Sequence, residues 1–483
     1  MPSAALLLWA PLPLLALPAV AALPGLAPTL LLLPAAFHAT SHAVAACRAT
    51  LLARGFAGRD LLKPHRPELV PESAGLPAAA TYVLLLFCFI PFKYARSDVH
   101  DLEARADGAW QGQIGGRSGF PHHELSLYLC ALLSILSSVL LGWLDDIFDI
   151  RWRLKMPIPL VASLPMLVVY HAGGGGTSVV VPGWPGFLRE LLGRVIDLGP
   201  LYYVFISMLS TFSVHSINIL AGINGVEVGQ AVVIAASLCV NSAMYLDPRA
   251  GEPGSWASKE LRDRHLFSLS LLVPFCGCAL GLLRWNRFPS RVFVGDTWCY
   301  FAGQVLACAG VLGHFSKTLL LFFIPQVFNF LLSCPQLFGI VPCPRHRVPK
   351  VHASSLALYP SRALLKDAKP SAKLSALRRP ILELLQALRL VQLEYDKRGA
   401  ITSTTNLTLI NALLVFAGVR GPPSLPADSA DGEGKEAAAD AAPSGPRITE
   451  PTLWGLVMGT QIAGSLLAFT VRYWLAGVVF PVQ

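Results

Sequence analysis

The sequence predicts an all-α, polytopic membrane protein with about ten transmembrane helices. Hydrophobic residues make up 54% of the 483 residues and charged residues only 14%, whereas a soluble domain carries about 25% charged residues. The apolar residues also gather in runs close to the length of about 20 residues that an α-helix needs to cross a bilayer. These observations exclude a soluble enzyme, a disordered scaffold and a secreted disulfide-rich module.

Ten apolar segments follow one another along the chain. They are 4–37, 76–92, 125–144, 156–170, 198–214, 228–246, 266–285, 298–313, 319–341 and 452–480. Two of them are short, so helix tilt or local thinning of the bilayer would have to compensate. The first could be a signal peptide, but it is long and lacks a basic start and a clear cleavage site. These features favour a retained first span.

We expect three parts: a transmembrane core at 1–341 with spans one to nine, a long loop at 342–451, and a last transmembrane helix at 452–483. In the loop, apolar residues recur at helical spacing at Ile381, Leu384, Leu385, Leu388 and Val391. This spacing predicts an amphipathic helix, either on a membrane surface or packed on a small soluble domain. The run 406–419 is too short to cross and favours an interfacial or re-entrant piece. The composition of 421–446 predicts a disordered insert.

The charge balance is basic, with 38 Lys and Arg against 29 Asp and Glu, a net charge of +9. This suits a basic cytosolic face or an anionic substrate. No basic module interleaved with aromatic residues is present, so we expect no nucleic-acid partner. The ten cysteines form no CxxC pair, which argues against a structural zinc site or a disulfide framework.

The unusual polar motifs all fall in the connections after odd-numbered spans, which share one side of the membrane. They are VPESAG at 70–75, DDIFD at 145–149, INILAGING at 217–225, FVGD at 293–296 and PCPRHRVP at 342–349. Random placement would divide them between both faces, so their convergence predicts one site at one membrane face. A multi-span transporter is the alternative class. It would gather polar groups near the midplane, often in two related halves, and the sequence shows no internal repeat.

Carboxylates and amides in these motifs suit a hard metal ion. Asp145 and Asp146 close a predicted helix at its C-terminal end, where acids oppose the macrodipole. The pair is either a solvated helix end or a functional pair that binds a metal, positions a proton or pairs with Lys155 and Arg153. Asp296 opens a helix as an N-cap or as a metal ligand, and Asn218 is a loop amide or a second ligand. A carboxylate, an amide oxygen and substrate phosphates together favour Mg²⁺.

Arg345, His346 and Arg347 stand between two prolines. They are either a positive-inside anchor or a group that recognises a phosphate or a sugar through planar guanidinium forks. No Walker loop, HExxH, GxSxG or GxGxxG motif is present. The combination predicts a magnesium-dependent transfer between a charged soluble substrate and a lipid, in which positioning and charge neutralisation do most of the work.

The same motifs resemble a known family. The runs GWLDDIFDIRWRLK at 142–155, INILAGINGVEVGQ at 217–230, SRVFVGDTWCYFAG at 290–303, GHFSKTLLLFFIPQVFNFL at 313–331 and PCPRHRVP at 342–349 carry the resemblance. They are similar to the eukaryotic UDP-N-acetylglucosamine–dolichyl-phosphate N-acetylglucosaminephosphotransferases. The resemblance implies transfer of N-acetylglucosamine-1-phosphate to dolichyl phosphate with release of UMP, the first step of N-glycan precursor synthesis. A related transferase that uses another nucleotide sugar or polyprenol stays open.

The resemblance also implies a multi-pass protein of the endoplasmic reticulum membrane, in contact with membrane lipids and assembled as a homodimer. Its catalytic core would have the active site on the cytosolic face, and 342–451 would be a cytosolic loop. Asn218 and Asp296 would bind Mg²⁺, with Asp145, Asp146 and Lys155 as catalytic residues. UDP-N-acetylglucosamine would be held by Arg59, Asp60, Leu61, Glu72, Gly222, Asn224, Phe293, Arg345, His346 and Arg347. Dolichyl phosphate would be held by Lys155 together with Thr211, Phe212, Ser213, Val214, His215, Ser216, Ile217, Asn218 and Ile219.

Overall fold

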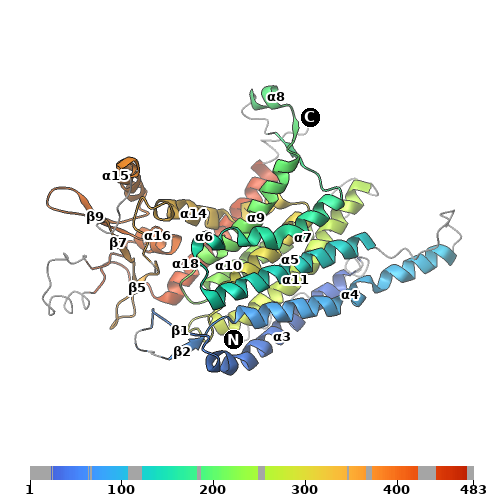
Figure 1. Ribbon diagram of the computed structural model, residues 1–483, viewed down its shortest axis with the longest axis horizontal. Helices are drawn as coiled ribbons and strands as arrows, with labels where there is room; N and C mark the ends of the chain where they lie inside the picture. The colour runs from blue at the N-terminus through green and yellow to red at the C-terminus, as the bar shows by residue number, and fades with distance from the viewer. Residues whose placement is uncertain are drawn as a thin grey trace.

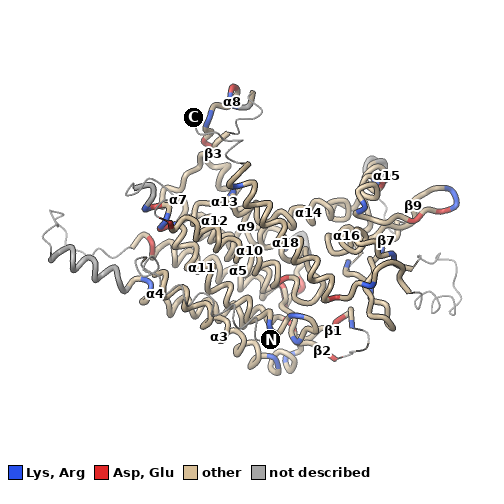
Figure 2. Tube along the Cα trace, turned by 180° about the vertical axis from the view of Figure 1, so that it is seen from behind, with Lys and Arg blue, Asp and Glu red and all other residues tan. Residues whose placement is uncertain are grey.

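The computed structural model describes residues 23, 25–63, 65, 68–106, 122–181, 187–247, 256–344, 347–365, 372–422 and 442–475. Helices dominate this part of the chain and run side by side in one bundle (Figure 1). A smaller body, built from residues between the ninth and the last predicted span, lies at one end of the bundle. Figure 2 shows that charged residues gather at the ends of the helices and in the smaller body, whereas the middle of the bundle is almost free of them.

The helices of the bundle overlap the ten predicted spans, although the first span is described as helix only at 26–37, where α3 begins before it continues to Ala53. They are α3 Leu26–Ala53, α4 Gly75–Ala106, α5 His122–Phe148, α7 Ile158–Ala172, α9 Pro200–Ile219, α10 Val226–Met244, α11 Trp256–Asn286, α12 Gly295–Leu312, the pair α13 Ser316–Phe322 and α14 Ile324–Leu337, and α18 Glu450–Thr470. Among the described residues, six of these helices are long and apolar enough to cross a membrane. The α13–α14 pair, bent by 68°, would make a seventh. The prediction of a polytopic membrane protein is therefore confirmed, and the count of ten transmembrane helices stays a prediction.

Helix α12 lies at the centre of the bundle, because every residue from its third position onward is buried. It packs against α5, α9, α11 and α4, and small residues allow the close approach. A Cβ added at Gly142 on α5 would lie 2.9 Å from the Cα atom of Thr297 on α12. The outer helices instead expose apolar stripes, such as Leu129, Leu133, Leu136 and Leu140 on α5. This is the pattern of a bundle surrounded by lipid.

The smaller body, hereafter the loop domain, consists of residues 342–449 in their described ranges. It contains the hairpin of β5 Lys350–Val351 and β6 Leu358–Tyr359, and an antiparallel sheet ordered β7-β9-β8. The strands of that sheet are β7 Arg362–Leu364, β9 Ile401–Thr405 and β8 Leu393–Tyr395, and the helices are α15 Ala372–Ala387 and α16 Leu409–Phe416. The prediction of an all-α fold was therefore too simple.

The packing of this region bears on two predictions. Leu382 of α15 is buried in a cluster with Val391 and Leu407, so this helix packs on a small domain, although Leu384 and Leu388 stay exposed. The expectation of an interfacial or re-entrant piece at 406–419 stays a prediction. Helix α16 is buried between the loop domain and the bundle, in a cluster that includes residues of α18. Most of the predicted disordered insert, 423–441, lies outside the described residues, as does the start of the first predicted span.

Two further hairpins mark the ends of the bundle. Strands β1 Ala57–Arg59 and β2 Leu69–Pro71 pair beside the end that carries the loop domain. Strands β3 Ser178–Val180 and β4 Val195–Asp197 enclose the short helix α8 Phe187–Leu192 at the start of α9. The end with β1, β2 and the loop domain is where the predicted polar motifs meet.

Candidate active site

A cavity of about 740 Å³ opens at this end of the bundle. All five polar connections contribute to its lining, through Arg59 and Glu72, Asp145 and Asp146, Asn218 and Asn224, Phe293 and Asp296, and Val348. The five polar motifs therefore do meet around one cavity, as the sequence predicts. The roles of the individual residues stay predictions.

Lys155 stands between two carboxylates. It ends the short helix α6 Trp152–Lys155, and its Nζ atom lies 2.6 Å from Asp145 Oδ2 and also pairs with Asp296. Burial by itself would lower the pKa of Lys155. The charges and hydrogen bonds of Asp296 and Asp145 outweigh burial and raise this pKa above its usual value. The ammonium therefore stays protonated at neutral pH as a fixed positive charge beside Asp145 and Asp296.

Asp146 caps a helix other than its own. Its Oδ1 atom accepts from the backbone N–H of Asp296 at 2.5 Å, and its Oδ2 atom accepts from the hydroxyl of Thr297 at 2.6 Å. The N-cap residue of α12, Val294, has no side-chain bond to offer, so Asp146 of α5 takes over this function. Gly295 has φ +72°, and a Cβ there would lie 2.9 Å from Asp146 Cγ, so this contact favours glycine.

This arrangement overturns two alternatives left open by the sequence. Asp146 is not a solvated helix end, and Asp296 does not cap α12 with its own side chain. The carboxylate of Asp296 instead points to Lys155 and to Asn218, whose Nδ2 atom donates to Asp296 Oδ1 at 2.6 Å. The sequence could not reveal the cap, because it joins residues 150 positions apart.

The donor set at Asp296 and Asn218 suits a magnesium ion that also binds substrate. An amide oxygen and nitrogen exchange places on rotation of the side chain, so Asn218 can present its oxygen beside Asp296 Oδ1. One carboxylate and one amide oxygen leave most positions of an octahedral ion to water and phosphate. Within the described ranges, no group of three or more His, Cys, Asp or Glu residues could hold a metal. An ion here would therefore depend on substrate oxygens.

The turn between α9 and α10 forms one wall of the cavity. Gly222 adopts φ +114°, and its N–H donates to Glu227 Oε1 at 3.3 Å. The Nε2 atom of Gln230 donates to the carbonyls of Leu220 and Ile217, at 2.9 and 3.1 Å. Two side chains of α10 therefore fix the conformation of this turn through hydrogen bonds to its backbone. Glu72 also lines this cavity, and burial and the nearby charge of Asp146 raise the pKa of its carboxyl group.

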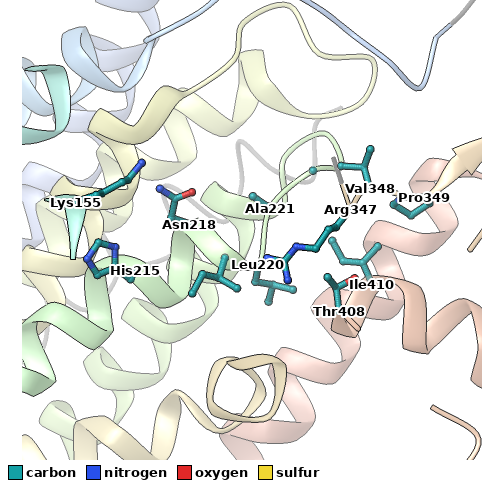
Figure 3. Close-up of a pocket in the computed structure, with 12 residues that line it drawn as sticks. Lys155, His215, Asn218, Leu220, Ala221, Arg347, Val348, Pro349, Thr408 and Ile410 are labelled. Carbon is teal, nitrogen blue, oxygen red and sulfur yellow. The ribbon is translucent and has the colours of Figure 1, made fainter. Parts of the chain in front are cut away.

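A second cavity, of about 290 Å³, adjoins the first (Figure 3). Lys155, His215 and Asn218 lie at one end of it, and Arg347 and Thr408 lie at the other. The residues that line both cavities are Asn218, Ala221, Gly222 and Val348. The Nη1 atom of Arg347 is buried and has no hydrogen-bond partner among the residues that the structure describes.

The remaining predicted residues divide into three groups. The large cavity is also lined by Asp60, Leu61, Gly222 and Phe293, and the small one by Ile219. Thr211, Phe212, Ser213, Val214, Ser216 and Ile217 line neither cavity; four of them, Ser213, Val214, Ser216 and Ile217, are buried in α9. Arg345 and His346 lie outside the described residues. Sequence reasoning missed Glu227, which lines the large cavity. It also missed Lys63 and Glu450, which bond to the cavity residue Asn224 and lie in none of the polar motifs.

Comparison with known proteins agrees with this geometry. The sequence model described as "Glycosyl transferase family 4" matches residues 128–314. The UDP-N-acetylglucosamine–dolichyl-phosphate N-acetylglucosaminephosphotransferase of Saccharomyces cerevisiae is 46% identical over 75% of this chain and 79% of its own length. The protein of the same name from Schizosaccharomyces pombe is 39% identical over 92% and 91% of the two chains. That from Dictyostelium discoideum is 46% identical over 61% and 68%. The chain therefore belongs to the family of UDP-N-acetylglucosamine–dolichyl-phosphate N-acetylglucosaminephosphotransferases.

Proposed function

We propose that this chain transfers N-acetylglucosamine-1-phosphate from UDP-N-acetylglucosamine to dolichyl phosphate and releases UMP, the first step of N-glycan precursor synthesis. The names and identities of its relatives support this reaction. The observation that carries it is the pair of cavities that meet at Asn218, beside Asp296 and Lys155. A reaction between two phosphate-bearing substrates needs two adjoining sites with the cationic groups at their junction.

The large cavity would hold the nucleotide sugar and the small one the lipid phosphate. Phe293 and Gly222 would flank the uracil, while Arg59, Asp60, Leu61, Glu72, Asn224 and the segment Arg345, His346 and Arg347 would hold the rest of the donor. In the reaction, an oxygen of dolichyl phosphate attacks the β-phosphorus of the donor. The bond from this phosphorus to the bridging oxygen breaks, and UMP leaves with that oxygen. His215 and Lys155 would face the attacking phosphate.

Charge neutralisation is the main task of the side chains at the junction. A Mg²⁺ ion held by Asp296 and Asn218 would neutralise the diphosphate of the donor. Lys155 brings a permanent positive charge to the attacking phosphate, and Asp145 fixes the position of its ammonium group at 2.6 Å. Asp146 holds the first turn of α12 and so positions Asp296. These contacts favour a positioning role for both acids of the pair.

We propose the following setting for this chemistry. All ten predicted segments cross the endoplasmic reticulum membrane, the cavities and the loop domain face the cytosol, and the protein is a homodimer in contact with membrane lipids. The loop domain lies at one end of the bundle (Figure 1), and Val348 and Arg347 of this domain help to line the cavities, so the cavities and the loop domain would face the cytosol together, where a nucleotide sugar is found. The dolichyl chain would remain in the bilayer beside the helices.

The full chain, purified in lipid nanodiscs, tests the proposal through the release of UMP. We expect release to require UDP-N-acetylglucosamine, dolichyl phosphate and Mg²⁺ together, and to stop when a chelator is added. Faster turnover with another UDP-sugar, such as UDP-N-acetylgalactosamine, would contradict the assigned donor. Undiminished turnover in the chelator would contradict the metal.

A further inference from the structure

A buried charged network lies behind the large cavity and joins four separate parts of the chain. The Nζ atom of Lys63 pairs with Asp60, lies 2.6 Å from Asn224 Oδ1 and 3.1 Å from Glu450 Oε2. The side chains of Lys63, Asp60 and Glu450 are only 12%, 8% and 4% exposed. Solvent screens such buried salt bridges poorly. Removal of one charge therefore changes the electrostatic energy of the remaining charges.

The network holds the Asn224 side chain in one orientation. Its Oδ1 atom accepts from Lys63 and, at 2.9 Å, from the backbone N–H of Ser290, while its Nδ2 atom donates to Asp60 at 3.0 Å. Lys63 also lies over the ring of Phe288, with 4.9 Å between Nζ and the ring centroid. One ammonium group, that of Lys63, therefore contacts three segments: the loop of Asp60, the turn of Asn224 and the loop after α11.

The last helix, α18, donates and accepts hydrogen bonds at the same turn. Glu450 begins α18, and its Oε1 atom accepts from the backbone N–H of Asn224 at 2.7 Å. One turn later, the indole N–H of Trp454 donates to the carbonyl of Gly225 at 3.1 Å. Residues four apart lie on one face of a helix, so both contacts come from the same face. A helix that follows the loop domain in the chain thus helps to shape the cavity wall.

We propose that Lys63 and Glu450 are positioning residues for the nucleotide part of the donor. This inference rests on the proposed function, since it assumes that the large cavity holds UDP-N-acetylglucosamine. Both residues act through Asp60 and Asn224, which line the cavity. Loss of either charge would shift these two groups relative to each other, and the affinity for the nucleotide would fall. The lipid phosphate and the Asp296 cluster should be affected much less, because no hydrogen bond or ion pair in the described part of the chain joins Lys63 or Glu450 to Lys155, Asn218 or Asp296.

The charges of the network predict which substitution weakens binding of the donor most. When all three groups are ionised, Lys63, Asp60 and Glu450 together carry a net charge of −1. Lys63→Met leaves two neighbouring carboxylates without a cation, whereas Glu450→Gln leaves the Lys63–Asp60 pair neutral. The double variant has the same net charge as the unchanged network. We therefore expect Lys63→Met to be the most damaging change, and Glu450→Gln added to it to restore part of the loss.

Steady-state kinetics of the full chain test this order. In Lys63→Met we expect the KM for UDP-N-acetylglucosamine to rise about tenfold or more. Its kcat and the KM for dolichyl phosphate should change by less than about twofold. Glu450→Gln should raise the donor KM by a smaller factor, and the double variant should lie between the two. The control is Arg379→Met with Glu383→Gln, an exposed pair on α15 at 2.7 Å, which should leave all constants unchanged.

Binding of UDP gives a second readout that does not depend on turnover. We expect UDP to raise the Tm of the unchanged protein and of the control, and to raise it less in Glu450→Gln. If Lys63→Met does not fold, Glu450→Gln alone provides the test. Equal UDP shifts in all variants, or a double variant worse than Lys63→Met, would refute the positioning role. If the unchanged protein binds UDP but releases no UMP, the proposed reaction fails while this inference is still decided by the UDP shifts.

Discussion

Replacement of Asp296 by Asn separates a metal-binding role from a structural one. The carboxylate of Asp296 contacts Lys155 and Asn218, while the first turn of α12 is capped by Asp146. Asn has the same shape as Asp and leaves the backbone N–H that donates to Asp146. The substitution therefore removes one negative charge and should leave the helix cap and the fold intact.

The size of the expected loss follows from what the charge does. Lys155 keeps Asp145 as a partner at 2.6 Å, so the ammonium stays in place. Asp296 is the one carboxylate we assign to direct contact with Mg²⁺. Loss of the stabilisation that a metal gives to developing charge should cost about 4 kcal/mol, or about a thousandfold in rate.

The assay is UMP release by purified, folded protein at several Mg²⁺ concentrations. Partial recovery of Asp296→Asn at high Mg²⁺ would support a weakened metal site. Asp263→Asn is a matched control, since Asp263 lies near the start of α11, 54% exposed and outside the lining of both cavities. Activity of Asp296→Asn within about threefold of the control, with unchanged Mg²⁺ dependence, would refute the metal assignment.

Three further predictions concern other parts of the chain. Because burial and the charge of Asp146 raise the pKa of Glu72 above its usual 4.5, the folded state binds this proton more tightly than the unfolded state, and stability falls as the pH rises through this window. Glu72→Gln should therefore raise the Tm at pH 7 and not near pH 4; an equal change at both values would contradict the assignment. Asn406, the acceptor of an N-x-T sequence, is 1% exposed and donates to Ser361 at 2.8 Å. It should carry no glycan, and a glycosidase-sensitive mass shift lost in Asn406→Gln would disprove this. Deletion of 422–443 should leave transfer within about twofold, because its composition forms no core and the bridge between Arg420 and Ser444 holds its ends together. Folded protein without activity would show that the segment is functional.

The sequence predicted the helices and the convergence of the site well, for physical reasons. Long apolar runs leave a chain few options other than membrane helices, so nine predicted spans matched a helix or helix pair, and the described end of the first lies in α3. Asp145, Lys155, Asn218 and Asp296 were recognisable because charged and amide groups inside apolar sequence need partners. These partners proved to be each other.

The loop domain and the supporting contacts could not be read in this way. Its strands are two to five residues long, too short to show a periodic pattern. Helix α16 has the composition of a membrane segment but is buried in protein, and composition alone does not distinguish the two. The cap by Asp146 and the contact of Lys63 with Glu450 join residues 150 and 387 positions apart, so only the fold reveals them.

The fate of the β-phosphate of the donor tests the central claim most directly. UDP-N-acetylglucosamine labelled at that phosphate is incubated with the purified full chain, dolichyl phosphate and Mg²⁺, and the lipid and aqueous products are separated. Transfer of the sugar together with its phosphate predicts that the label enters the lipid fraction as a diphosphate while unlabelled UMP appears in water. Label recovered in water as UDP, with the sugar alone on the lipid, would contradict the account.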